Sequence, residues 1–161
     1  MKPSTSNKTE KIQLKIESFC AYQERCKKEV INKLKSWGLE KKTIDEIVLN
    51  LLNQDYLNEI RYSKSYSRGK FRIKKWGRLK IYQELRKRNI SEPNIKIGLE
   101  EIEEEYYLTC KELVKKIWKS SNSKSLIEKK KKIWDYLRYR GWEKSLIFDM
   151  IEKVEKKASD L

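Results

Sequence analysis

Residues 34–39 read Leu-Lys-Ser-Trp-Gly-Leu, which is typical of the end of a helix, and the chain repeats this ending twice. Residues 85–90 read Leu-Arg-Lys-Arg-Asn-Ile and residues 137–142 read Leu-Arg-Tyr-Arg-Gly-Trp, at spacings of 51 and then 52 residues. In each copy Gly or Asn stands where the backbone turns left-handed, a conformation that Gly adopts freely and Asn tolerates. The apolar residue that follows is placed to contact the leucine that opens the segment.

Apolar stripes keep the same register beyond each ending. The spacing i, i+4, i+7 predicts a second helix in every copy, and the matched positions are Ile44, Val48 and Leu51, then Ile95, Leu99 and Ile102, then Ile147, Ile151 and Val154. Tyr62 and Tyr66 correspond to Leu113 and Ile117 in a third helix of the first two copies. Three unrelated helices with similar endings would explain the turns alone, but the stripes in register favour true repetition.

The fold class predicted from this pattern is all-α. We expect tandem three-helix repeats, two complete and a third that ends before or just inside its third helix. Units of this size cover one another's apolar faces, so an elongated, curved array is expected. The predicted organisation is a disordered N-terminal lead-in over 1–15, repeat 1 over 16–69, repeat 2 over 70–122 and repeat 3 over 123–161.

Composition excludes several classes of protein. The chain has no histidine, so it offers neither a Ser-His nor a Cys-His nucleophile pair, and its three cysteines form no CxxC pair that could hold zinc. No Gly-rich phosphate loop of the Walker type occurs. No stretch of roughly 18 to 20 apolar residues could span a bilayer. We therefore predict a cytoplasmic protein that is not an enzyme, with no catalytic residues, no cofactor, no metal site and no membrane partner. We also expect a monomer.

Positive charge is concentrated in one segment. The formal net charge is +15, and between Arg61 and Arg88 twelve basic residues face one acidic residue, Glu84. Aromatic residues are interleaved with these cations, an arrangement that favours contact with nucleic acid phosphates. The candidate binding residues are Arg61, Arg68, Lys70, Arg72, Lys74, Lys75, Trp76, Arg78 and Lys80.

One other reading of this segment stays open, a solvated basic face around ordinary core aromatics. Helical spacing places Tyr62 and Tyr66 in the core. A smaller basic zone, Lys129–Lys132 with Arg138 and Arg140, occurs in the third copy, and a bowed array would turn both zones toward one groove. The glutamates of residues 100–105 look like a solvated acidic stretch.

The chain resembles the RecX family of bacterial regulatory proteins. The resemblance covers about residues 16–158 and is carried by Tyr-Leu-Asn-Glu-Ile-Arg-Tyr-Ser-Lys-Ser-Tyr at 56–66, Lys-Trp-Gly-Arg-Leu-Lys-Ile at 75–81, Glu-Leu at 84–85, Asn-Ile at 89–90 and Tyr-Leu-Arg-Tyr-Arg-Gly-Trp at 136–142. Tyr62 stands where the family often has Phe, Asn89 replaces the commoner Gly, and Ile60 is more apolar than usual. None of these departures breaks a predicted element.

The resemblance implies a function that composition alone does not. RecX proteins are described as three tandem three-helix repeats that lodge in the groove of the RecA filament on DNA and inhibit recombinase and coprotease activity. The implied partners are therefore the RecA filament and single- and double-stranded DNA, contacted through the phosphate backbone. The main alternative from the residues alone is a free-standing nucleic-acid-binding helical protein that acts without RecA. Two further alternatives are an adaptor that docks other proteins on its repeats and a metal-dependent nuclease, which would need only Asp and Glu and no histidine.

Overall fold

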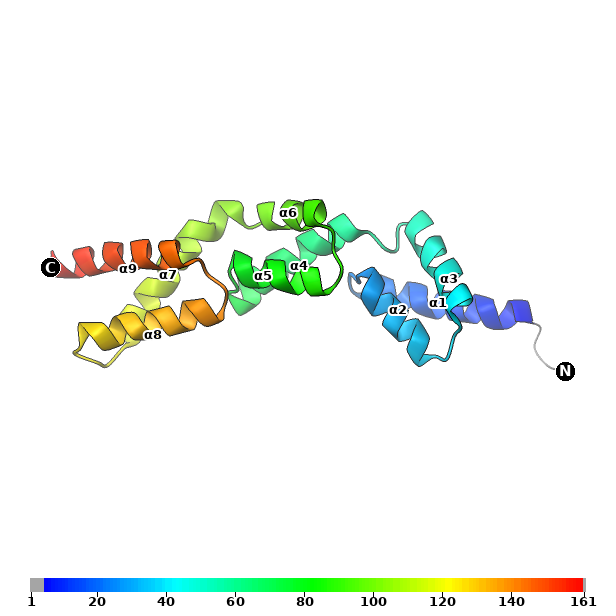
Figure 1. Ribbon diagram of the computed structural model, residues 1–161, viewed down its shortest axis with the longest axis horizontal. Coiled ribbons are helices and arrows are strands. Elements are labelled where there is room, and N and C mark those ends of the chain that lie inside the picture. Colours follow the sequence, from blue (N-terminus) through cyan, green and yellow to red (C-terminus); the bar gives the residue numbers. More distant parts are fainter. Residues whose placement is uncertain (1–4, 161) are drawn as a thin grey trace.

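The computed structural model describes residues 5–160, and this part of the chain is an elongated array of helices without strands (Figure 1). The elements are α1 (Thr5–Tyr22), α2 (Lys27–Ser36), α3 (Lys41–Asn53), α4 (Glu59–Lys74), α5 (Arg78–Lys87), α6 (Glu92–Glu100), α7 (Glu103–Ser120), α8 (Leu126–Tyr139) and α9 (Lys144–Ser159). The all-α class and the elongated shape are confirmed. No helix of the described range is long and apolar enough to cross a membrane.

The predicted lead-in is wrong over residues 5–15, because α1 begins at Thr5. Residues 1–4 of that lead-in lie outside the described residues. Ile16 and Cys20 are buried, and Ile12 and Phe19 pack against the same core. The apolar residues of α1 are few and are surrounded by polar residues, so the sequence pattern did not indicate a helix here. Tertiary packing stabilises α1.

The helices pack in threes that begin one helix earlier than expected. Within the array, α4 packs against α5 and α6, and α7 packs against α8 and α9. The expected boundary between residues 69 and 70 falls inside α4, and the third unit, α7–α9, is complete rather than truncated. The period of a repeat is the same whichever helix is taken as its first. Only the packing of the helices therefore shows where each unit begins. We therefore name the units unit 1 (α1–α3), unit 2 (α4–α6) and unit 3 (α7–α9).

The predicted helix endings are confirmed in all three copies. Gly38, Asn89 and Gly141 have φ angles of 74°, 59° and 81°. In the second and third copies the amides of Ile90 and Trp142 donate to the carbonyls of Leu85 and Leu137, the bond that closes a Schellman motif.

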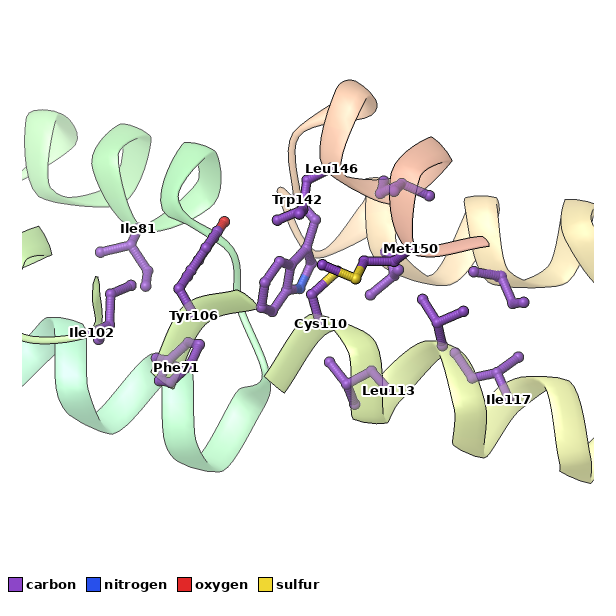
Figure 2. Close-up of a cluster of buried hydrophobic side chains, with 14 of the residues drawn as sticks. Phe71, Ile81, Ile102, Tyr106, Cys110, Leu113, Ile117, Trp142, Leu146 and Met150 are labelled. Carbon is purple, nitrogen blue, oxygen red and sulfur yellow. The ribbon is translucent and has the colours of Figure 1, made fainter. Parts of the chain in front are cut away.

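The apolar core falls into two clusters. One belongs to unit 1, while the other runs without interruption through units 2 and 3. Where those two units meet, Tyr106 stacks on Trp142 with ring centroids 4.5 Å apart, and Phe71 lies 5.9 Å from Tyr106 (Figure 2). The indole nitrogen of Trp142 donates to the carbonyl of Lys75 at 2.9 Å. Units 2 and 3 therefore form one body through shared aromatic packing.

A close backbone approach completes this junction. The amide of Gly77 donates to the carbonyl of Arg140 at 2.8 Å, and the amide of Leu79 donates to the carbonyl of Gly141 at 3.1 Å. A Cβ added at Gly77 would lie 2.5 Å from the Gly141 oxygen, so only glycine fits there. The start of α5 is thereby held against the end of α8.

Unit 1 is attached mainly through polar contacts. Arg61 in α4 bonds Glu24 through its Nε at 2.5 Å, and it reaches Asp55 through Nη1 at 3.0 Å. Lys28 Nζ donates to the carbonyl of Lys87 at 2.7 Å. Cys26 adds an apolar contact, because its buried side chain belongs to the core of units 2 and 3.

The three cysteines are buried free thiols. Desolvation raises the pKa of Cys20 to about 11 and that of Cys110 to about 12, and it also raises the pKa of Cys26. Only the thiolate is alkylated. At pH 8 we expect iodoacetamide to modify the native protein about a hundredfold more slowly than the urea-unfolded protein, given an unperturbed pKa near 8.5. Mass spectrometry of quenched samples measures both rates, and equal rates would contradict burial of the thiols.

Candidate nucleic-acid interface

The structure divides the nine candidate residues into two groups. The four arginines among these candidates form ion pairs with acidic side chains, whereas the four lysines among them pair with no carboxylate in the described range 5–160. Trp76 lies among the lysines. The segment predicted as one basic face is therefore partly structural and partly available for a ligand.

Arg61, Arg68 and Arg72 lie along α4 and pair with carboxylates from elsewhere in the chain. Arg61 holds Glu24 and Asp55, as described above, and the hydrogen bond that it donates to Glu24 raises the pKa of its guanidinium. Arg68 Nη1 lies 2.7 Å from a carboxylate oxygen of Glu101. Arg72 lies 2.7 Å from a carboxylate oxygen of Glu105. These three arginines fasten α4 to its neighbours.

Arg78 is a fourth structural arginine. It pairs with Glu103 at 3.3 Å and with Glu143 at 3.2 Å, so it bridges α5, α7 and the start of α9. Its guanidinium carbon lies 3.9 Å from the centre of the Tyr106 ring. The acidic stretch over residues 100–105 is thus not merely solvated, because it neutralises arginines of unit 2.

Lys70, Lys80 and Trp76 form a cation–aromatic row at the junction of units 2 and 3. Lys70 lies 5.1 Å from the centre of the Trp76 ring, and Lys80 lies 4.6 Å from it. Lys80 also lies 4.6 Å from the Tyr139 ring. Trp76 is half-buried against the core, and Tyr139 is 76% exposed. The row therefore continues from α4 across α5 to the end of α8.

Arg140 extends this row into unit 3. Its guanidinium carbon lies 3.6 Å from the Tyr136 ring, and one of its nitrogens donates to the Tyr136 carbonyl at 3.3 Å. The hydrogen bond from Gly77 to the carbonyl of Arg140 fixes this residue beside Trp76. Part of the second basic zone thus joins the first. Lys130 and Lys131 of that zone are instead paired with Glu155 and Asp135.

We call this surface the junction row. Its members lie where units 2 and 3 meet, and they are either aromatic side chains or cations that form no ion pair within the described residues. Ring contacts place Lys70, Trp76, Lys80, Tyr136, Tyr139 and Arg140 in it. Lys74 and Lys75 are included because they stand at the end of α4, directly before Trp76 in the chain. Lysines stacked on aromatic faces retain a full positive charge toward solvent. A row of this kind can bind phosphates electrostatically and offers ring surface to bases.

Sequence reasoning missed Tyr136 and Tyr139 as members of this surface. A signal was present, since residues 136–140 read Tyr-Leu-Arg-Tyr-Arg, which alternates aromatic and basic side chains as the first segment does. Tyr62 is 3% exposed and Tyr66 packs against the core, as their spacing predicted.

The ion pairs of α4 predict acid sensitivity. The hydrogen bond from Arg68 lowers the pKa of Glu101, and hydrogen bonds from Asn58 and Arg61 lower that of Asp55. Because these pKa values are lower in the folded than in the unfolded state, their stabilisation is present above about pH 4.5 and is lost as pH falls through the folded values. The urea midpoint should therefore drop from pH 5 to pH 3.

The matched variants for this prediction are Glu101→Gln and Glu100→Gln. Glu101→Gln should flatten the fall in the urea midpoint, because amide side chains do not titrate, whereas Glu100→Gln should leave it as in the parent. Identical pH profiles for the parent and Glu101→Gln would contradict the assigned role of this pair.

Comparisons with known proteins agree with the arrangement. The family model of the RecX second three-helix domain matches residues 58–99, and that of the RecX third three-helix domain matches residues 103–151. These matches begin close to the first residues of α4 and α7, which supports the packing-based units. A protein of Bacillus cytotoxicus named regulatory protein RecX is 26% identical over 156 residues. The alignment covers 96% of this chain and 58% of that relative, so the chain spans less than two thirds of its length.

Solved structures share the fold. The crystal structure of RecX from Lactobacillus salivarius superposes with a TM-score of 0.81 at 24% identity, covering 93% of this chain and 98% of that one. A second crystal structure, that of a regulatory protein RecX, gives a TM-score of 0.80 at 22% identity and covers 93% of this chain and 75% of that one.

Proposed function

This chain belongs to the RecX family, and we propose that it binds the RecA filament on DNA and inhibits recombinase and coprotease activity. The junction row supports this proposal, because its lysines have no carboxylate partner within the described range. These lysines are Lys70, Lys74, Lys75 and Lys80. Their charge is available to an external polyanion, whereas the arginines of the same segment are engaged within the fold.

The shape of the molecule supports a filament partner. A nucleoprotein filament presents a continuous groove with DNA phosphates within reach, and an elongated array can follow such a groove (Figure 1). The junction row is held on one body because units 2 and 3 share a core. Complementary charge would steer the array toward the filament and orient it there. Occupying the groove would obstruct duplex and repressor substrates without any chemistry by the binder.

Aromatic and apolar side chains beside the lysines would add short-range specificity. Tyr139 is 76% exposed, and Ile73, which lies next to Lys74, is 79% exposed. Exposed side chains of this size in a charged surface provide contacts that phosphate attraction alone does not.

The charge argument predicts a salt dependence. If Lys70, Lys74, Lys75, Lys80 and Arg140 each neutralise one phosphate, log affinity for duplex DNA should fall with log salt at a slope of about −4.5, from roughly 0.9 per phosphate. For single strands the slope should be about −3.5, from roughly 0.7 per phosphate. Fluorescence anisotropy at several salt concentrations measures both slopes. An affinity that does not change with salt would contradict phosphate contact.

A second candidate is a nucleic-acid-binding protein that acts without RecA. It is favoured by one observation, that Trp76 and Tyr139 lie between cations, which is the combination that single-strand binding proteins use. The two candidates are separated by comparing affinity for bare single-stranded DNA with affinity for a preformed RecA–ATP filament on the same DNA. A large preference for the filament supports the modulator, and equal affinities support the free-standing binder.

A further inference from the structure

A groove lies between α7 and α9, apart from the junction row. Its volume is about 620 Å³, and Trp118, Val154 and Ala158 provide its apolar floor. The helices on its two sides pack against each other, and Val154 belongs to the shared core of units 2 and 3. Trp118 is half-buried and packs against that core, so its position is fixed.

Lysines line both sides of this groove. Lys111, Lys115 and Lys119 recur every four residues along α7, and Lys153 and Lys157 do the same along α9. Residues four apart lie on one face of a helix, so each helix contributes a row of cations. Asp160 is the one acidic residue that lines the groove within the described range.

Internal carboxylates neutralise only some of these lysines. Lys115 pairs with Glu112, and Lys153 pairs with Asp149. Lys111, Lys119 and Lys157 form no ion pair in the described part of the chain. The groove therefore presents unpaired positive charge on both banks of an apolar floor.

This arrangement suits a ligand with an apolar centre and negative charge along both sides. Nucleic acid fits that description less well, because its phosphates could pair with the lysine rows but its bases offer no aliphatic side chains to the floor at Val154 and Ala158. An amphipathic helix does fit it, since one apolar stripe can lie on Trp118 and Val154 while acidic side chains on its flanks reach the two lysine rows.

We propose that the α7–α9 groove is a docking site for an acidic amphipathic helix of a partner protein. The apolar stripe of that helix would contact Trp118, Val154 and Ala158, and its carboxylates would pair with Lys111, Lys119 and Lys157. This site is distinct from the junction row, so it would recruit a protein and leave the phosphate-binding surface unobstructed.

The test uses the full chain and a fluorescein-labelled peptide of about 18 residues, roughly five helical turns, with leucines along one face and glutamates elsewhere. The decisive variant is Lys119→Glu with Lys157→Glu, and its matched control is Lys41→Glu with Lys42→Glu, two exposed lysines of α3. We expect the first variant to weaken peptide binding at least about tenfold, because it replaces attraction with like-charge repulsion, and the control to bind as the parent does.

An additional variant and two control ligands test the proposal independently. Ala158→Gln, which places a polar group on an exposed part of the floor, should also weaken binding, whereas circular dichroism should show that every variant stays folded. A parent chain that binds no glutamate peptide, or that binds it as tightly after the Lys119 and Lys157 reversal, overturns the proposal. So does a single-stranded oligonucleotide or a phosphatidylglycerol vesicle whose binding is abolished by that reversal while the peptide's is unaffected. None of these outcomes depends on RecA, so they are independent of the filament assay.

Discussion

Replacing Lys74, Lys75 and Lys80 with glutamate is expected to weaken binding to a RecA–DNA filament by about a hundredfold. At 0.15 M salt each lost phosphate contact removes roughly 0.7 of a log unit from the affinity, so three contacts remove about two log units, and the new carboxylates add repulsion. Inhibition of RecA strand exchange should shift to correspondingly higher protein concentrations. Arg78 is left out of this variant because it pairs with Glu103 and Glu143 inside the fold.

The matched control reverses three exposed lysines of unit 1, Lys8, Lys41 and Lys42. It changes net charge by the same amount, so a general effect of charge would appear in both variants. We expect the control to lose only a small fraction of the affinity. If the two triple variants inhibit strand exchange equally, the junction row is not the binding surface.

Replacing Trp142 with alanine is expected to lower the free energy of unfolding by about 3 to 5 kcal/mol, the usual cost of truncating a fully buried large aromatic. Trp142 is 0% exposed, stacks on Tyr106 and lies 6.1 Å from Phe71 (Figure 2). The change also leaves the carbonyl of Lys75 without its indole donor. Equilibrium urea unfolding followed by circular dichroism measures the loss.

Trp76→Ala is the matched comparison for this second prediction. Trp76 is half-buried and belongs to the junction row, so its removal should destabilise the fold much less while weakening filament binding. Trp142→Ala should weaken both stability and binding, because the indole fixes the backbone at Lys75. A Trp142→Ala variant as stable as the parent would show that units 2 and 3 are not joined through this aromatic cluster.

The helix endings were predictable because their chemistry is local. A residue with positive φ followed by an apolar contact is visible in six residues of sequence, and Gly38, Asn89 and Gly141 adopt the expected conformation. The first helix was not predictable from such signals. Its buried residues Ile16 and Cys20 make sense only against the rest of unit 1, because tertiary contacts rather than helix propensity stabilise α1.

The candidate site was predictable as a segment but not residue by residue. A run of cations in the sequence does not show which of them meet carboxylates from other helices. Arg68 and Arg72 are paired with Glu101 and Glu105, thirty-three residues away in the chain. Only the fold shows that the lysines remain unpaired and that Tyr139 joins them.

We propose that this chain inhibits RecA by binding its filament on DNA through the junction row. A titration of RecA ATPase and strand-exchange activity with the purified chain tests this, from ratios below one per RecA protomer up to saturation. We expect the parent chain to inhibit strand exchange and the variant with Lys74, Lys75 and Lys80 reversed to lose that inhibition. Unaltered strand exchange at a saturating concentration of the parent chain would contradict it.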